Sequence, residues 1–225
     1  MTILDNCKLT YFPLPARAES IRLALKIGGV EFEDERIAFK DWQALKPSTP
    51  WGSLPQLTLA TGEVIAQQRA ILRLVGKLTG LYPEDPVQAA LVDSIMDACE
   101  DLGTVTNKQG QGLAQAEKEA ARAKAYEEGG AVAAILKNVE GYIGRNGGSG
   151  GYSVGSSLTI ADLFLFSAIG AITSGLYDGV PLDAVDTGYP NITAVRKTVR
   201  SQPAVVDWYN NLDKDIRIAP SYGPF

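Results

Sequence analysis

Near the start of the chain, the side chain best suited to take part in chemistry is that of Tyr11, which lies at the end of a strand-like segment. Residues 13–16, with two prolines, break this segment, and residues 17–26 then repeat apolar side chains at helical spacing. The phenol therefore faces the start of a helix, where backbone N–H groups without intrahelical partners favour anions. This arrangement predicts a ligand-sized site between the strand and the helix.

Histidine is absent from the chain, which limits the chemistry that such a site could use. Imidazole general bases, nucleophiles activated by histidine, and zinc sites with histidine ligands are all excluded. The two cysteines, Cys7 and Cys99, form no CxxC pair and indicate neither a disulfide framework nor a metal knuckle. Catalysis must then depend on tyrosine, arginine, lysine, carboxylates or a bound cofactor.

The elements of the first half position the phenol in a mixed sheet. Residues 56–60 begin directly after a proline, which suits a strand start, and Gly62 and Glu63 separate them from a short second run. The expected order is βαβ and then ββα, with strands at 8–12, 33–39, 56–60 and 64–65 and helices at 17–26 and 67–78, the last ending at Gly80.

After a rigid linker at 83–86 the pattern becomes purely helical. Thr159 and Asp162 form a capping pattern in front of residues 163–172, which are apolar nearly all round and predict a buried central helix. The glycine-rich residues 146–151 follow no strand and precede no GK[ST] motif, so they predict a loop and not a phosphate site. The helices are expected at 87–102, 113–126, 132–143, 163–172, 192–200 and 204–212.

Composition and charge narrow the class of protein. The chain has 225 residues, of which 45% are hydrophobic, enough for two domains, which we place at 1–82 and 87–225. A net charge of -5 argues against nucleic acid as a partner. We find no 18-residue apolar run and an N-terminus too polar for a signal peptide, so we expect a cytoplasmic protein that does not enter membranes.

Five motifs together resemble the glutathione transferases, most closely the sigma class that includes glutathione-dependent prostaglandin D synthases. They are LTYFPLPARAESIRLAL from Leu9, DW before Lys46, WGSLPQL from Trp51, QQRAILR from Gln67 and SLTIADL from Ser157. The resemblance implies the glutathione transferase fold, with a thioredoxin-like α/β N-terminal domain and an all-α C-terminal domain. It also implies a homodimer, with glutathione as co-substrate and no required metal.

The resemblance assigns the catalytic role to Tyr11, with Arg17 as its electrostatic support. A free thiol has a pKa of about 8.5, and the thiolate is the nucleophile. A phenol that donates a hydrogen bond to the sulfur, together with a helix N-terminus, can lower that pKa by roughly two units, which needs ~2.7 kcal/mol. The residues alone leave other readings open: Tyr11 as a core tyrosine, and Arg17 in a surface ion pair.

The resemblance also implies a set of contacts to glutathione. Trp42 and Lys46 match contacts to its glycyl end, and the backbone of Leu54 before a cis-Pro55 would pair with its cysteinyl peptide in the manner of an added strand. Gln67 and Gln68 open a helix whose N–H groups would receive the γ-glutamyl carboxylate. Asp101 matches an acidic residue that reaches the γ-glutamyl amine from the other subunit.

The acceptor site is expected on the same side of the strand–helix junction. Asp97, Glu100 and Asp101 match an acidic patch that binds a divalent cation in some relatives, although an arginine-paired face is the commoner outcome for such a set. The residues expected to contact the acceptor are Phe12, Leu14, Pro15, Met96, Gly103 and Thr104.

The sequence therefore predicts an enzyme that activates glutathione and conjugates it to small hydrophobic electrophiles in detoxification. Gln68 stands where most members have serine, a better N-cap, and this departure motivates an alternative: a non-catalytic ligand carrier or structural protein. A glutathione-dependent prostaglandin isomerase is a further alternative, weakened because Lys108 falls near where such relatives have a tryptophan.

Overall fold

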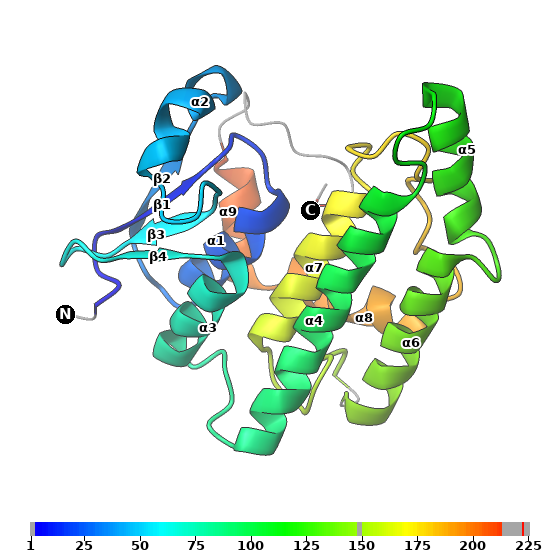
Figure 1. Cartoon of the computed structure of the whole chain (residues 1–225). Coiled ribbons are helices and arrows are strands. Elements are labelled where there is room, and N and C mark those ends of the chain that lie inside the picture. Colours follow the sequence, from blue (N-terminus) through cyan, green and yellow to red (C-terminus); the bar gives the residue numbers. More distant parts are fainter. Residues whose placement is uncertain (1–2, 148–149, 213–221, 223–225) are drawn as a thin grey trace.

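The computed structural model of the chain describes residues 3–147, 150–212 and 222. It contains a four-stranded mixed sheet beside a group of helices (Figure 1). The expected fold class, a thioredoxin-like α/β domain followed by a helical domain, is confirmed.

The sheet has the strand order β2-β1-β3-β4, so β1 occupies an inner position. β1 pairs parallel with β2 and antiparallel with β3, and β3 pairs antiparallel with β4. The parallel pair needs a crossover, which α1 provides. The strands are β1 (Cys7–Tyr11), β2 (Phe32–Arg36), β3 (Gln56–Thr58) and β4 (Val64–Ala66).

The second strand is shorter than expected. It ends at Arg36, although the N–H of Ile37 still donates to the carbonyl of Tyr11 at 2.8 Å. The polar connection expected after it contains three short helical turns, η1 (Phe39–Asp41), α2 (Trp42–Leu45) and η2 (Lys46–Ser48).

Two helices complete the first half. α1 (Ala16–Ile27) has buried residues on all sides because it packs against α3 as well as against α7 and α9 of the second half. α3 (Gln68–Thr79) ends where Gly80 adopts a left-handed conformation (φ 74°), which glycine reaches without steric cost.

The second half is helical, as expected. α4 is longer than predicted: it begins at Pro86, the last residue of the expected linker, where Asp85 caps it, and it continues to Lys108 instead of ending at residue 102. The gap at 148–149 falls within the expected glycine-rich loop, and those two residues lie outside the described part of the chain. The helices are α4 (Pro86–Lys108), α5 (Gln115–Tyr126), α6 (Ala131–Asn146), α7 (Ile160–Ile172), α8 (Pro190–Arg200) and α9 (Pro203–Asn210).

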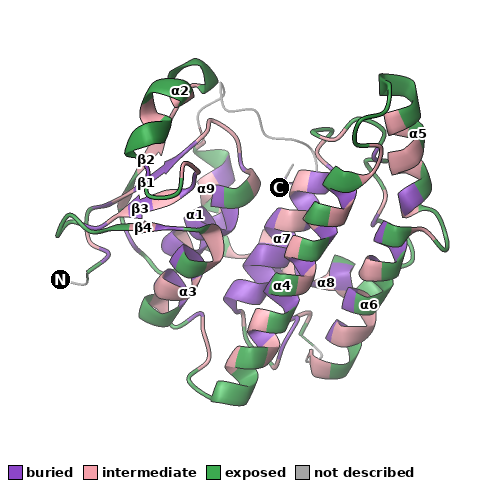
Figure 2. Cartoon of the chain, viewed as in Figure 1, coloured by how far each residue is buried: buried purple, intermediate pink, exposed green. Residues whose placement is uncertain are grey.

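α7 is the central helix of the second half, as its apolar sequence predicts. It packs against α1, α4 and α8, and nearly all of its residues are buried (Figure 2). Within the described residues, no helix is both long and apolar enough to cross a membrane.

The expected capping box of α7 is present. The Thr159 side chain accepts from the N–H of Asp162, and an Asp162 carboxylate oxygen accepts from the N–H of Thr159 at 2.7 Å. Asp162 also accepts from the N–H of Ser153 at 2.6 Å. This buried carboxylate thus fixes both the helix start and the loop before it.

Thr159→Ala should lower the free energy of unfolding by about 1 kcal/mol, the usual cost of losing an N-cap side chain. The melting temperature should fall by about 2–4 °C for a chain of this size, which circular dichroism can measure. Thr61→Ala, in the exposed turn between β3 and β4, is the matched control and should cost less than about 0.5 kcal/mol. Equal losses in the two variants would contradict the capping role.

Candidate active site

Tyr11 is the last residue of β1, and its side chain is 6% exposed. The backbone N–H of Arg17, in the first turn of α1, acts on this hydroxyl and favours its ionised form. The guanidinium carbon of Arg22 lies 5.8 Å from the centre of the Tyr11 ring, and the Phe12 ring meets it edge-on at 5.4 Å. The strand and the helix together therefore fix the phenol.

Burial raises the pKa of Tyr11 above its ordinary value, and the Arg17 N–H and the charges of Arg17 and Arg22 only partly oppose this. The phenol therefore keeps its proton at neutral pH. A protonated phenol can donate a hydrogen bond to an anion, and it cannot act as a general base. The geometry favours stabilisation of a ligand's negative charge.

Tyr11 forms part of the wall of a cavity of about 330 Å³ between the β1–α1 loop and helices α4 and α7. We call it the apolar cavity, because most of its wall consists of apolar side chains. It is lined by Tyr11, Phe12, Leu14, Ala16, Arg17, Phe39, Gln68, Cys99, Glu100, Gly103, Asn107, Phe164, Ser167, Ala168, Ala171, Ile172, Leu176 and Tyr177.

A second cavity, of about 270 Å³, lies between the starts of α1 and α3 and the segment before β3. We call it the polar cavity. Its wall includes the cis Leu54–Pro55 peptide and Gln67, which precedes α3 with φ 74°. It is lined by Arg17, Ser53, Leu54, Pro55, Gln67, Gln68, Arg69, Ala70, Arg73 and Glu100.

Three residues, Arg17, Gln68 and Glu100, line both cavities. The two spaces therefore adjoin at the start of α1, close to the phenol of Tyr11. A molecule with a charged part and a reactive group could bind with its charged part in the polar cavity and its reactive group facing the apolar cavity.

The arginines of the polar cavity are paired with carboxylates of α4. Arg17 lies 3.1 Å from Glu100 and Arg69 lies 2.8 Å from Asp97, so two of the acidic residues considered for a cation are arginine-paired within the same chain. Arg73 likewise pairs with Asp93 at 2.8 Å. Among the described residues, no cluster of three potential ligands could hold a metal ion.

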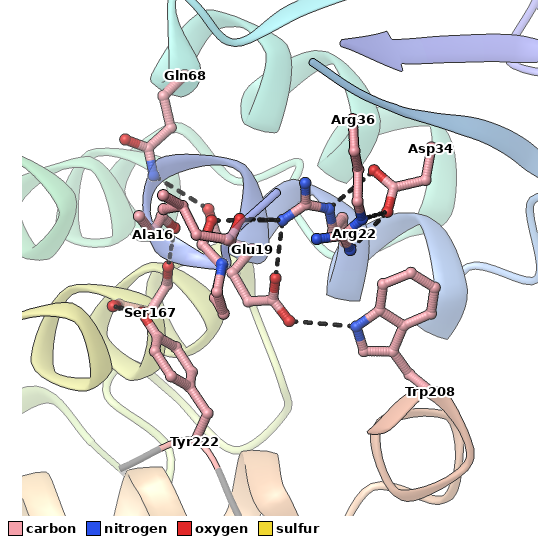
Figure 3. Close-up of polar contacts among 12 residues, drawn as sticks. Ala16, Glu19, Arg22, Asp34, Arg36, Gln68, Ser167, Trp208 and Tyr222 are labelled. Carbon is pink, nitrogen blue, oxygen red and sulfur yellow. Dashed lines mark hydrogen bonds and ion pairs between the residues drawn. The ribbon is translucent and has the colours of Figure 1, made fainter. Parts of the chain in front are cut away.

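Gln68 is anchored toward α1. Its side-chain amide donates to the hydroxyl of Ser20, at 3.2 Å, as Figure 3 shows. The amide that stands in place of the family's serine is therefore restrained, and the first residues of α3, Gln68, Arg69 and Ala70, line the polar cavity.

Four of the residues expected to contact glutathione line the polar cavity, namely Leu54, Pro55, Gln67 and Gln68, together with Arg17. The Trp42 ring instead packs edge-on against Phe12 at 5.6 Å. The other two expected contacts lie outside the cavity wall, since Lys46 is exposed beside Gly52 and Asp101 is exposed on α4.

The expected acceptor residues divide into three groups. Phe12, Leu14 and Gly103 line the apolar cavity, and Pro15 lines an adjoining cavity of about 420 Å³ beyond Ala171. Met96 is fully buried in the core and Thr104 points to solvent, so neither of these two α4 residues lines the apolar cavity. The helix turns a different face toward the cavity than we expected.

Several residues that line the cavities were not predicted from the sequence. Ala168 and Ala171 of α7 line the apolar cavity. Because nearly all residues of this helix are apolar, its sequence does not indicate which face lines a cavity. Tyr177 and Leu176 come from the segment after α7, for which we made no prediction. Glu100 was considered only as a member of the acidic set with Asp97 and Asp101, and not as a residue that lines both cavities.

Two family models match the chain. The first, described as the glutathione S-transferase N-terminal domain, matches residues 7–77, and the second, described as the C-terminal domain, matches residues 106–211. A protein named glutathione S-transferase 1 from Ascaris suum is 35% identical over 208 residues, which cover 91% of this chain and 96% of that one.

Solved structures agree with these matches. The prostaglandin D synthase of Nilaparvata lugens superimposes with a TM-score of 0.81 at 27% identity, covering 92% of this chain and 98% of that one. A sigma-class glutathione S-transferase from Fasciola hepatica gives a TM-score of 0.78 at 27% identity, covering 94% of this chain and 99% of that one.

Proposed function

The chain belongs to the glutathione S-transferase family of enzymes, and we propose that it activates the glutathione thiol through the Tyr11 hydroxyl and conjugates it to small hydrophobic electrophiles. The observation that carries this proposal is the buried, protonated phenol beside the junction of the polar and apolar cavities. We assign the reaction to detoxification in the cytoplasm, without nucleic acid or membrane as partner.

The chemistry follows from charge stabilisation at sulfur. The thiol releases its proton to water, and the Tyr11 hydroxyl donates a hydrogen bond to the resulting thiolate. The sulfur lone pair then forms a bond to an electrophilic carbon, and the leaving group, such as chloride, departs with its electron pair. One charge-assisted hydrogen bond with a helix N-terminus can supply the ~2.7 kcal/mol needed for a shift of roughly two pKa units.

The polar cavity suits the rest of the tripeptide. Glutathione carries two carboxylates and an amine, and the cavity offers arginines, the N–H groups at the start of α3, and Glu100. In this proposal residues 1–82 form the domain that binds the tripeptide, and residues 83–86 link it to the second domain. Residues 87–225 form that second domain and supply most of the acceptor site. Trp42, Lys46, Leu54, Pro55, Gln67 and Gln68 contact glutathione.

Asp101 does not face the polar cavity of its own chain, and in the proposal it serves the site of a second copy in a homodimer. Its exposure on α4 is compatible with that role. Sedimentation analysis should give the mass of a dimer, and Asp101→Asn should weaken glutathione binding.

The experiment that tests the proposal is a glutathione titration followed by tryptophan fluorescence, together with conjugation of a chloronitrobenzene. We expect saturable binding, retention on immobilised glutathione and thioether formation. Failure of all three would favour the ligand-carrier alternative that Gln68 motivates.

Gln68→Ala should raise the dissociation constant of glutathione about fivefold, the effect of one hydrogen bond. The same fluorescence titration measures this dissociation constant. The variant also loses the hydrogen bond to Ser20, which restrains the start of α3. Gln88→Ala, an equal truncation at the exposed start of α4, is the control and should leave the constant unchanged. Similar constants for both variants would remove Gln68 from the binding site.

The name of one similar structure, a prostaglandin D synthase, favours a second candidate activity, glutathione-dependent isomerisation of a prostaglandin endoperoxide. It would use the same thiolate and the same apolar cavity. Product analysis after incubation with the endoperoxide and glutathione separates the two activities, because isomerisation releases glutathione unchanged.

A further inference from the structure

Among the described residues, three side chains with a hydroxyl group line the apolar cavity, those of Tyr11, Ser167 and Tyr177. The Ser167 hydroxyl donates its proton to the carbonyl of Ala16 at 2.7 Å, so this proton is already used within the chain. Tyr11 serves the sulfur of glutathione in the proposed function. Of the three hydroxyls, that of Tyr177 therefore remains for the second reactant.

The Tyr177 hydroxyl is held by a side chain of α4. It accepts a hydrogen bond from the side-chain amide of Asn107, at 3.3 Å, and Asn107 also lines the apolar cavity. The same amide donates to the carbonyl of Gly103, at 3.0 Å, which fixes it along the helix. In the part of the chain that the structure describes, no group accepts the Tyr177 proton. A phenol that accepts one hydrogen bond donates its own proton more strongly, because hydrogen bonds in a chain polarise one another.

Helix α5 holds the segment that carries Tyr177. The Asp178 carboxylate accepts from the side-chain amide of Gln115 at 3.0 Å, and the Asp178 carbonyl accepts from the Arg122 guanidinium at 3.2 Å. The guanidinium carbon of Arg122 also lies 5.6 Å from the centre of the Tyr177 ring, a distance at which a cation and an aromatic ring attract each other. The ring is therefore fixed from α5 while its hydroxyl contacts α4.

We propose that Tyr177 is a catalytic residue on the acceptor side of the reaction, whose hydroxyl donates a hydrogen bond to an oxygen of the electrophile. The inference rests on the proposed function, since Tyr11 supplies the thiolate. It selects a class of acceptor, namely compounds with a carbonyl group conjugated to a carbon–carbon double bond, because their oxygen gains negative charge as sulfur adds. A donor that is already in position stabilises such a charge without reorganisation, and an apolar site strengthens the effect.

The step balances without a further reactant. A sulfur lone pair forms a bond to the β-carbon of the acceptor, and the electron pair of the carbon–carbon double bond moves between the α-carbon and the carbonyl carbon. The carbonyl π pair moves to the oxygen, which accepts a hydrogen bond from Tyr177. Water then protonates the α-carbon and the carbonyl group re-forms. The hydroxide that remains combines with the proton that the thiol released, and no group leaves.

The test compares two aromatic acceptors: cinnamaldehyde, which has a conjugated carbonyl group, and benzyl chloride, which has no oxygen and reacts by loss of chloride. Tyr177→Phe keeps the ring beside Arg122 and removes only the hydroxyl. It should lower the turnover of cinnamaldehyde at least about tenfold, the effect of one hydrogen bond to a charged group. The KM should change little, because the charge forms only in the transition state. The turnover of benzyl chloride should be unchanged.

Tyr142→Phe is the matched control. Tyr142 also has an arginine near its ring, with the guanidinium carbon of Arg145 at 6.0 Å from the ring centre, but it lies on α6 outside both cavities. This variant should conjugate both acceptors at the wild-type rate. An unchanged rate of Tyr177→Phe with cinnamaldehyde, or an equal loss with both acceptors, overturns the proposal.

Should Tyr177→Phe not fold, Asn107→Ala takes its place, because Asn107 is exposed on α4 and its amide holds the phenol oxygen. The turnover of cinnamaldehyde relative to that of benzyl chloride should then fall about fivefold, as for one neutral hydrogen bond. An unchanged ratio in a chain that conjugates both acceptors overturns this inference alone. A wild-type chain that conjugates neither acceptor overturns the proposed function as well.

Discussion

Replacing Tyr11 with phenylalanine is expected to lower the rate of glutathione conjugation at least about tenfold at neutral pH, while glutathione still binds. The variant keeps the ring that packs in the core and loses only the hydroxyl. Without that donor the pKa of the bound thiol should return toward the value of a free thiol, about 8.5. Initial rates with a chloronitrobenzene and a fluorescence titration with glutathione measure the two effects separately.

The pH profile makes this expectation specific. Burial raises the pKa of Tyr11, so the phenol remains a donor through the neutral range and the wild-type advantage should be largest at low pH. As the pH rises above about 8.5 the unassisted thiol ionises, and the two rates should converge. Tyr142→Phe, an equal deletion on α6 outside both cavities, should leave the profile unchanged. A constant ratio between wild type and Tyr11→Phe at all pH values would contradict thiolate stabilisation.

Glu19→Ala is expected to lower the free energy of unfolding by about 3–5 kcal/mol, because it leaves a buried guanidinium short of a partner. Arg22 is fully buried and donates to Glu19 at 3.0 Å and to Asp34 at 2.9 Å. Burial acts to lower the pKa of Arg22, but these two carboxylates outweigh it and raise the pKa. Glu19 also accepts from the indole N–H of Trp208 at 3.1 Å, so the variant leaves a second donor unpaired (Figure 3).

Chemical denaturation measures this loss, and the melting temperature should fall by on the order of 10 °C. Glu31→Ala provides the comparison, since Glu31 also forms an ion pair with a residue of α1, Lys26 at 3.5 Å, but is 90% exposed. An exposed pair contributes less than about 1 kcal/mol. If both variants lost the same stability, burial would not be the cause of the effect.

The fold could be predicted largely from local patterns. The apolar run after Thr159 and Asp162 identified α7 as a buried helix, and Gly80 identified the end of α3, because each feature depends on residues close in sequence. The end of β2 was harder to locate, since Ile37 still pairs with β1 while the chain already turns. Strand ends depend on the neighbouring strand, which a single segment does not reveal.

The candidate site was predictable only in part. The motifs located Tyr11 and the wall of the polar cavity, but not which face of α4 meets the apolar cavity: Met96 is in the core while Gly103 lines the cavity. The rotation of a helix follows from its partners, here α6 and α7. The contact between Ser167 and Ala16 joins residues 151 positions apart, and neither residue type suggests a role by itself.

The burial of α1 on all sides has a consequence for how the protein unfolds. This helix packs against β1 and α3 of the first half, and it also packs against α7 and α9 of the second half. If the two halves separated, the faces of α1 that contact α7 and α9 would become exposed to water. Neither half would then have a complete hydrophobic core of its own. Thermal unfolding should therefore be a single cooperative transition. A substitution that destabilises α7 or α9 should also destabilise β1, the strand that carries Tyr11.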